Sequence, residues 1–437
     1  MAQIGFKRLR IEDWRQFSHV DLEIHPRLTI ITGANGAGKS TLLGFFSRHF
    51  GYHRAYLSVP RTVGGLISFS VGLFSRLNLK KTSWFSRDRS APVAQQIGEI
   101  SYVGGASSAL RLPASVGLHY SVQIDQQQSV PGIHIDSHRP PNIYRPLASI
   151  PATPPSSKSI GSELNNEYMQ YFSGGQFSQG SLYHIKLALI QMSIFGHGNQ
   201  TMQPVPELIE LFKGFEDTLR SVLPKSLGFQ RLLIRSPEIL LSTKSGDFLI
   251  DAASGGVIKL FEIAWQLYFF SRSLSGAGEF VITLDEPENH LHPSMQKALL
   301  PNLLDAFPHA QIIVVTHSPF IITALRDSYV YVLRYEDDEI QADDDDESIR
   351  GLMGAKVFAE RLDTINKAGT ASEILRDVLG ITTTIPDWAE TRIEEIVSRY
   401  RDSAVSKEVL TRLYSELESE GLSSSYPSAV SQLTRRV

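Results

Sequence analysis

The sequence predicts an α/β fold: a mixed central sheet with an antiparallel β lobe, followed by a helical C-terminal region. Apolar, β-branched segments at 27–32, 280–284 and 312–315 are typical of buried strands, and each is followed by glycine or polar residues. Residues 58–165 are rich in Ser, Gly, Pro and Gln and contain alternating strand-like pieces, which indicates the lobe. The chain from 350 onward has helical spacing, which predicts the C-terminal region.

A phosphate loop follows the first of these strands. Residues 33–40 read Gly-Ala-Asn-Gly-Ala-Gly-Lys-Ser, a full G-x-x-x-x-G-K-[ST] pattern, and 41–46 can carry an apolar helical face. In a strand–loop–helix context, glycines let backbone N–H groups surround a phosphate, while the lysine reaches the β- and γ-phosphates and the serine binds Mg²⁺. We therefore expect ATP and Mg²⁺ to bind here, through Gly33, Asn35, Gly36, Gly38, Lys39, Ser40 and Thr41.

The bulk composition is that of an ordinary globular protein. The 437 residues are 42% hydrophobic and 9% aromatic, with a net charge of −4, so no global charge favours nucleic acid or anionic membrane. The absence of cysteine excludes disulfides, thiol nucleophiles and thiolate metal sites. No apolar run reaches the length of about 18 residues that a membrane span needs. We expect a cytoplasmic protein with no membrane partner.

The N-terminal segment and the lobe offer weaker candidates. Residues 4–32 predict a β-hairpin beside the nucleotide, where Arg10, Trp14 and Arg15 either contact base or ribose or are ordinary hairpin side chains. In the lobe, a basic and aromatic segment either holds a nucleic-acid backbone or is a solvated loop; its residues are Arg76, Lys80, Lys81, Trp84, Phe85, Arg87 and Arg89. His134, Asp136 and His138 share one strand face and are either a metal site or the polar end of a core strand.

The middle of the chain predicts both helices and strands. The proline-rich segment 140–155 predicts an extended linker, helical spacing covers 179–193 and 206–223, and alternating pieces follow at 229–234 and 238–250.

Two further strand ends carry chemistry. The buried strand 280–284 runs into Asp285 and Glu286, where the aspartate can bind Mg²⁺ and the glutamate can take a proton from the attacking water. The strand 312–315 leads into Thr316 and His317, and a histidine at that position can donate to the γ-phosphate. We expect Glu286 and His317 to be catalytic and Ser40 and Asp285 to be metal ligands.

The phosphate loop, the segment 285–293 (Asp-Glu-Pro-Glu-Asn-His-Leu-His-Pro) and the segment 316–319 (Thr-His-Ser-Pro) together resemble an ABC-type ATPase head of the RecF, SMC and OLD kind. The resemblance implies a P-loop NTPase fold and two heads paired around two nucleotides. It further implies a signature whose serine and glycine touch the γ-phosphate bound by the partner chain.

Two segments compete for this signature. Residues 173–176 match the literal Ser-Gly-Gly-Gln, whereas 253–256 read Ala-Ser-Gly-Gly. The signature of such heads opens a long helix that runs into the acidic strand, and 257–274 has the spacing of that helix. We therefore assign Ser254 and Gly256.

The same resemblance governs the remaining motifs. His290 and His292 either form a zinc pair or lie in the loop that crosses the head interface. The family's Q-loop glutamine has no clear counterpart; Gln95, Gln96, Gln123 and the His138-Arg139 end of a strand are the alternatives. The acidic run 343–347 predicts a solvated loop rather than a cation site. The tail predicts helices at 371–378, 388–400 and 406–420, without the acidic strand ends of an OLD-type nuclease.

We expect four regions: 1–57, the first part of the head with the phosphate loop; 58–165, the inserted lobe and linker; 166–340, the second part of the head; and 341–437, the helical region. The first functional hypothesis is an ATPase that dimerises on ATP and controls a partner effector, a nuclease, as in the Septu and PARIS defence systems that the chain resembles. The alternatives are a slow nucleotide-gated scaffold and a repair head that acts directly on DNA; a transporter subunit is the least favoured.

Overall fold

The computed structural model describes residues 4–63, 66–70, 95–114, 117–177, 180–274, 278–336, 356–362, 374, 386–400 and 406–434. The chain divides into two compact units, Met1–Gly369 and Thr370–Val437. Within the described part, no helix combines the length and apolar character needed to cross a membrane.

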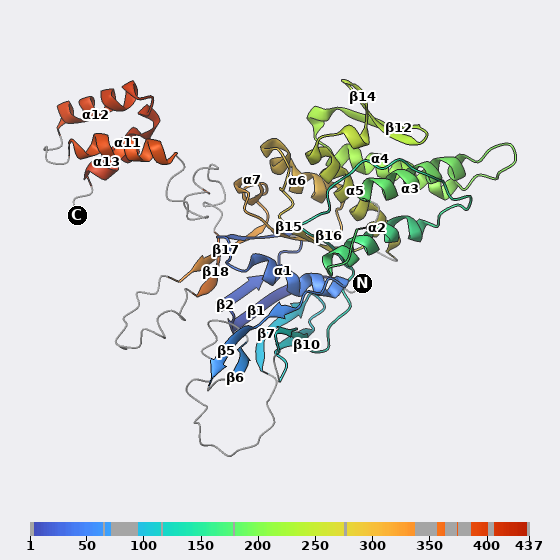
Figure 1. Cartoon of the computed structure of the whole chain (residues 1–437), viewed down its shortest axis with the longest axis horizontal. Helices are drawn as coiled ribbons and strands as arrows, with labels where there is room; N and C mark the ends of the chain where they lie inside the picture. The colour runs from blue at the N-terminus through green and yellow to red at the C-terminus, as the bar shows by residue number, and fades with distance from the viewer. Residues whose placement is uncertain are drawn as a thin grey trace, which may run out of the picture. The chain divides into compact units, whose positions relative to one another are not determined.

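Eleven described strands form the main sheet of the first unit, in the order β10-β8-β7-β1-β2-β18-β17-β3-β16-β15-β11 (Figure 1). The strands at the β11 end run parallel to one another, so their carboxyl ends meet at one edge. These parallel strands are β11 (Gly132–Ile135), β15 (Phe280–Asp285), β16 (Ala310–Val315), β3 (Leu28–Gly33) and β17 (Tyr329–Tyr335). β3, β15 and β16 are buried along their whole length, as their apolar composition predicted.

The other part of the sheet is largely antiparallel. It consists of β1 (Phe6–Trp14), β2 (Phe17–Glu23), β7 (Gln96–Tyr102), β8 (Ser107–Arg111) and β10 (Gln123–Ile124). The predicted N-terminal hairpin is confirmed as β1 and β2. Four strands of the expected inserted lobe are not separate from the head: β7, β8 and β10 extend the main sheet from β1, and β11 pairs with β15 at its other edge. The shorter strands β4 (Tyr56–Leu57), β5 (Val59–Val63), β6 (Leu66–Ser70) and β9 (His119–Tyr120) form two further pairs.

The sequence did not predict one strand of the main sheet. β18 (Val357–Arg361) pairs antiparallel with β17 and parallel with β2, so it joins the two parts of the main sheet. It lies inside the region 341–437 that was expected to be helical, and that boundary is therefore wrong. Five residues, only one of them fully buried, are too short a segment to show a strand period.

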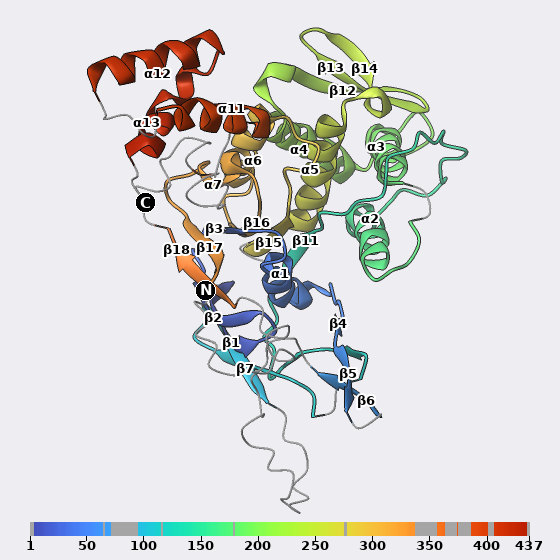
Figure 2. The same ribbon diagram turned by 60° about the vertical axis from the view of Figure 1, so that its left-hand side comes forward.

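The helix α1 (Lys39–Ser47) lies between a group of helices and the antiparallel strands. In Figures 1 and 2, α2 to α5 and the small sheet β12–β14 lie on one side of α1, while β1, β2 and β7 lie on the other. The elements of the first group are α2 (Ser157–Phe172), α3 (Ser181–His197), α4 (Pro206–Val222), β12 (Phe229–Arg235), β13 (Glu238–Thr243), β14 (Gly246–Leu249) and α5 (Gly255–Ser273). These bounds confirm the predicted helices at 179–193, 206–223 and 257–274, whereas α2 was not predicted.

Two aromatic clusters fill the interior of the first unit. Trp14 packs against Phe45 and Tyr56, with ring centroids 5.5 and 5.0 Å apart, and so ties the hairpin to α1. Phe215 of α4 packs edge-on against Trp265 of α5 at 4.9 Å. The helix α5 is buried from 256 to 269, which makes it the central helix of its group.

The second unit has its own apolar core. Its described helices are α11 (Asp387–Ser398), α12 (Lys407–Ser419) and α13 (Tyr426–Thr434), and the first two confirm the predicted segments 388–400 and 406–420. Their buried residues include Ile393, Leu413 and Leu417. The basic segment from Arg76 to Arg89, the acidic run 343–347 and all but Ile374 of the predicted helix 371–378 lie outside the described residues.

The burial of α5 gives a first prediction. Leu267 is 0% exposed, so Leu267→Ala is expected to lower the free energy of unfolding by about 2–5 kcal/mol through lost burial and a residual cavity. The matched control is Leu118→Ala, where the side chain is 50% exposed and the change should stay within about 0.5 kcal/mol. Urea unfolding followed by circular dichroism measures both. Equal midpoints for the two variants would contradict the buried position of α5.

Candidate nucleotide site

The phosphate loop connects the buried strand β3 to α1. Gly33, Gly36 and Gly38 all have positive φ angles, of 138°, 80° and 95°. A Cβ on Gly33 would lie 2.4 Å from the carbonyl oxygen of Leu333, and a Cβ on Gly38 would lie 2.4 Å from the ring of Phe17. Glycine is therefore required at both positions by backbone conformation and by space.

The first turn of α1 provides free N–H donors. Its N-cap is Gly38, which has no side chain to accept from them, and the first turn holds no acidic residue. Asn35 and Gly36 are exposed in the loop, and Thr41 is half-buried at the start of the helix. This arrangement suits an anion at the helix N-terminus.

Lys39 is the buried cation of the loop. Its side chain is 5% exposed, and Nζ donates to the carbonyl oxygens of Gly33 and Ala34 at 3.0 and 2.9 Å. Burial lowers the pKa of Lys39 to about 8, although the charges of Glu286 and Asp285 act in the opposite direction. Two of its three N–H donors are satisfied by these carbonyls, which leaves one for an anionic ligand.

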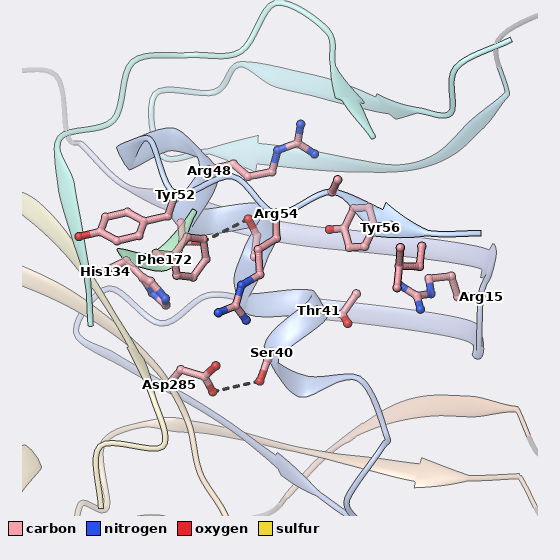
Figure 3. A pocket seen from close by; sticks show the side chains of 14 residues that line it. Arg15, Ser40, Thr41, Arg48, Tyr52, Arg54, Tyr56, His134, Phe172 and Asp285 are labelled. Carbon is pink, nitrogen blue, oxygen red and sulfur yellow. Dashed lines mark hydrogen bonds between the residues drawn. The ribbon is translucent and has the colours of Figure 1, made fainter. Parts of the chain in front are cut away.

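Asp285 lies at the carboxyl end of β15, beside the loop. The Ser40 hydroxyl donates to its Oδ1 at 3.1 Å, which joins residues 245 positions apart (Figure 3). Burial raises the pKa of Asp285 to about 6, against the lowering effect of the Ser40 hydrogen bond. A hydroxyl and a carboxylate at this distance are the oxygen donors that Mg²⁺ prefers, so the pair fits a bound magnesium ion.

Glu286 follows Asp285 in an unusual backbone conformation. Its φ of 45° lies in the left-handed region, which costs a residue other than glycine about 1–3 kcal/mol. The backbone is held there by a hydrogen bond from Glu286 N to the carbonyl oxygen of Val315 at 2.9 Å. Its carboxylate is about one-third exposed and lies 3.4 Å from His317 Nε2. The strained turn thus directs a partly solvated carboxylate toward the histidine.

His317 follows β16 by two residues. Burial lowers its pKa, and the nearby Lys39 lowers it further, so the ring is neutral at pH 7. A neutral ring can donate from Nε2 to the Glu286 carboxylate. The structure therefore brings together five of the predicted residues: Lys39, Ser40, Asp285, Glu286 and His317.

Glu288 is a residue whose role the sequence reasoning missed. Its carboxylate is buried, and Oε1 accepts from Thr316 Oγ1 at 2.6 Å and from the backbone N–H of His317 at 2.8 Å. These bonds fix the backbone that carries His317. The available signal for this role was the position of Glu288 two residues after Glu286, in the segment 285–293. Spacing alone, however, does not distinguish a buried glutamate from a solvated one.

Ser254 and Gly256 lie at the start of α5. Ser254 is the N-cap, exposed and without a side-chain capping bond. Gly256 is buried, and a Cβ there would lie 3.0 Å from the carbonyl oxygen of His290. The competing Ser173 is the C-cap of α2, at the wrong end of a helix to present N–H donors to an anion.

The structure locates the residues for which the sequence left alternative roles open. Arg15 lines the cavity next to Ser40 and Thr41, whereas Trp14 is buried in the core and Arg10 pairs with Asp21. His134 is buried against Thr283, His292 caps α6 (Pro293–Ala306), and no metal-binding group of three His, Asp or Glu is found in the described part of the chain. Gln96 and Gln123 lie in antiparallel strands of the sheet, and Gln95 directly precedes β7. The strand end next to Asp285 carries Asp136, with His138 and Arg139 following it.

Two segments of the chain match known protein families. Residues 8–52 match the family "AAA domain", and residues 235–323 match the family "AAA domain, putative AbiEii toxin, Type IV TA system". These two segments contain all of the candidate site residues.

Three curated relatives share parts of the chain. Septu protein PtuA of Bacillus thuringiensis is 24% identical over 48% of this chain and 53% of its own length. The Retron Ec83 probable ATPase of Escherichia coli is 31% identical over 27% of this chain and 23% of its own length. The Retron Vc95 probable ATPase of Vibrio cholerae serotype O1 biovar El Tor is 31% identical over 16% of this chain and 14% of its own length. The chain thus spans about half the length of PtuA and less of the other two.

Among solved structures, the SMC head domain from Thermotoga maritima has a TM-score of 0.39 at 11% identity, over 82% of this chain and 100% of that chain. The SMC head bound to the C-terminal winged-helix domain of ScpA has a TM-score of 0.38 at 12% identity, over 82% and 98%. Parts of the chain are therefore similar to AAA domains, to Septu protein PtuA and to two probable retron ATPases.

The raised pKa of Asp285 gives a second prediction. An acid with a pKa near 3.8 unfolded and about 6 folded destabilises the ligand-free protein above pH 6, and this loss disappears as the pH falls toward 4. Asp285→Asn is therefore expected to stabilise the ligand-free protein at pH 7.5 by about 1–3 kcal/mol while weakening Mg²⁺-dependent nucleotide binding. Thermal unfolding at pH 7.5 and pH 4 measures the first effect.

The control for this prediction is Asp305→Asn, on the exposed surface of α6. It should leave the melting temperature and nucleotide binding unchanged at both pH values. Equal stability of wild type and Asp285→Asn at pH 7.5 would contradict the burial cost assigned to Asp285.

Proposed function

We propose that the chain is an ATPase of the SMC, RecF and OLD-like class, which binds and hydrolyses ATP at a site completed by a second copy of the chain. We further propose that the resulting cycle controls a partner effector in anti-phage defence. The observation that carries the first proposal is the convergence of Lys39, Ser40, Asp285, Glu286 and His317 at the carboxyl ends of three parallel strands. The matches to Septu protein PtuA and to the retron ATPases support the defence role.

In this proposal Lys39 and the free N–H groups of α1 hold the β- and γ-phosphates. Ser40 and Asp285 hold Mg²⁺, which when bound neutralises charge on the phosphate oxygens. The negative triphosphate offsets the burial cost of the Lys39 ammonium and restores its full charge. Binding therefore relieves part of the electrostatic strain of the ligand-free site.

Glu286 is the proposed general base. Its partly exposed carboxylate accepts a proton from the attacking water, and the neutral imidazole of His317 orients that carboxylate through Nε2. Glu288 holds the His317 backbone and so maintains this distance. The contacts of His317 with Glu286 and with Glu288 are already formed in the free chain.

The second copy is proposed from the placement of Ser254 and Gly256. They cap a helix whose first turn has no acidic residue and no side-chain cap, which again suits an anion. The resemblance to paired ATPase heads assigns that anion to the nucleotide of the facing chain. The segment also packs on the loop after Glu286, at His290, so a contact made by the partner can reach the catalytic carboxylate.

Glu286→Gln tests the proposed base. The substitution keeps the shape of the side chain but removes its proton-accepting oxygen, so ATP hydrolysis should fall by about 10²–10⁴-fold while ATP binding persists. Phosphate release and isothermal titration with ATP measure the two properties, and gel filtration with ATP should show a lasting dimer. Glu163→Gln, at an exposed position of α2, is the matched control. Normal turnover by Glu286→Gln would remove the assignment.

Mixing two inactive variants tests the composite site. Lys39→Ala loses nucleotide binding, and Ser254→Arg places a bulky cation at the proposed interface. A mixed dimer retains one complete site, with Lys39 from one chain and Ser254 from the other. Mixing should therefore restore a substantial part of wild-type hydrolysis, whereas a site contained within one chain would stay inactive at every mixing ratio.

A further inference from the structure

A buried lysine lies in α3, outside the candidate nucleotide site. Lys186 is 1% exposed, and its Nζ donates to Asp251 Oδ2 at 3.0 Å and to Glu238 Oε2 at 3.4 Å. The same Nζ donates to the carbonyl oxygen of Arg145 at 3.2 Å and lies 4.8 Å from the ring centroid of Tyr144. All three N–H donors of the lysine are therefore used, and its charge is held in a fixed position.

The two carboxylates that bind Lys186 come from different segments. Glu238 is the first residue of β13, whereas Asp251 lies in a short 3-10 turn, Ile250–Ala252, just before α5. The Asp251 side chain is 8% exposed and that of Glu238 is 18% exposed, and charges removed from water to this degree need a partner. Lys186 thus joins α3 both to the small sheet and to the turn before α5 (Figure 2).

The turn that carries Asp251 also sets the position of Ser254. Ile250 is 0% exposed, and the N–H of Ala253 donates to its carbonyl oxygen at 3.1 Å. Ser254 follows directly as the exposed N-cap of α5. The turn therefore has two anchors, an apolar one at Ile250 and an ionic one at Asp251, and Ser254 stands at its solvent-facing end.

The charge of Asp251 affects what the start of α5 can bind. A carboxylate just before a helix N-terminus offsets the partial positive charge of that terminus and repels an approaching anion. The ammonium of Lys186, 3.0 Å away, neutralises this carboxylate. The ion pair thus keeps the N-terminus of α5 suited to a phosphate, in addition to holding the turn.

We propose that Lys186 is a positioning residue for the second half of the composite ATP site: through Asp251 it holds the turn that presents Ser254 to the nucleotide of the facing chain. The inference rests on the proposed composite site and adds to it a residue that touches neither nucleotide. Lys186 therefore acts on hydrolysis at the partner's phosphate loop and not on nucleotide binding by its own chain. Glu238 binds the same ammonium but lies outside the turn, so it has no such role.

Lys186→Met and Asp251→Ala test the pair, and Lys213→Met, at an exposed position of α4, is the matched control. Binding of Mg²⁺–AMP-PNP, a non-hydrolysable ATP analogue, should change less than about threefold in isothermal titration, because the phosphate loop is unaltered. ATP hydrolysis should fall about 10–100-fold in both variants and stay at the wild-type rate in the control, since a displacement of about 1 Å is enough for such a loss. Asp251→Ala keeps the Lys186–Glu238 pair, so it decides the matter if Lys186→Met does not fold. Wild-type hydrolysis by Asp251→Ala overturns the inference.

Glu238→Gln separates positioning from stability. It removes the charge of the other partner and leaves the Lys186–Asp251 contact, so hydrolysis should stay within about threefold of the wild-type rate. Each rate is measured at a temperature at which circular dichroism shows the variant to be folded. Equal losses of hydrolysis in Glu238→Gln and Asp251→Ala would show that the cluster is only structural and would overturn the inference.

Mixing experiments assign the pair to one half of the site. When Asp251→Ala is mixed with Lys39→Ala, one interface combines an intact phosphate loop with an intact Ser254 segment, so hydrolysis should recover. When it is mixed with Ser254→Arg, both interfaces have a defective Ser254 segment, and hydrolysis should stay low at every mixing ratio. Recovery with Ser254→Arg would overturn the inference alone. Failure of Lys39→Ala and Ser254→Arg to complement each other would instead count against the composite site itself.

Discussion

The common orientation of β3, β15, β16 and β11 is the constraint on which the site depends. Parallel strands place their carboxyl ends at one edge, and the ladder fixes their relative heights, with Asp285 opposite Val315. This register brings Ser40 to 3.1 Å from Asp285 across 245 residues of chain, and it places Asp136 at the neighbouring strand end. A loss of pairing between β15 and either neighbour would separate the phosphate loop from its acidic partner.

The ligand-free site concentrates unfavourable features. Lys39 and Asp285 are buried charges whose pKa values are lowered to about 8 and raised to about 6, and Glu286 holds a left-handed backbone. Hydrogen bonds from neighbouring segments hold such conformations in place. For example, the Glu288 carboxylate accepts from Thr316 Oγ1 and from the backbone N–H of His317. Such a site gains from ligands of opposite charge: the proposed triphosphate would offset the lysine, and the proposed Mg²⁺ would offset the aspartate. The same groups that lower the stability of the free chain therefore increase the benefit of binding.

The helices α1 and α5 both lack an acidic residue in their first turn, but their N-termini have different neighbours. That of α1 belongs to the phosphate loop, whereas that of α5 packs through Gly256 on the loop that follows Glu286. The catalytic turn therefore lies between the nucleotide side and the proposed partner side. An arrangement of this kind suits a protein in which assembly and hydrolysis depend on each other.

The sequence by itself determined the local chemistry. The spacing of 33–40, the acidic strand end at 285–286 and the apolar periods of β3, β15, β16 and α5 predicted the nucleotide, its strand–loop–helix setting and the segments that meet there, because each signal is complete within about twenty residues. The long helix after Ser254 also favoured Ser254 over Ser173 as the signature serine, and that assignment stays a prediction. Only the tertiary structure decided what crosses between segments: the helix α2, the sheet position of β18, the buried role of Glu288, and the pairing of Lys186 with Asp251. These depend on which strands become neighbours and which charges lose water, and neither is encoded in the spacing of any single segment.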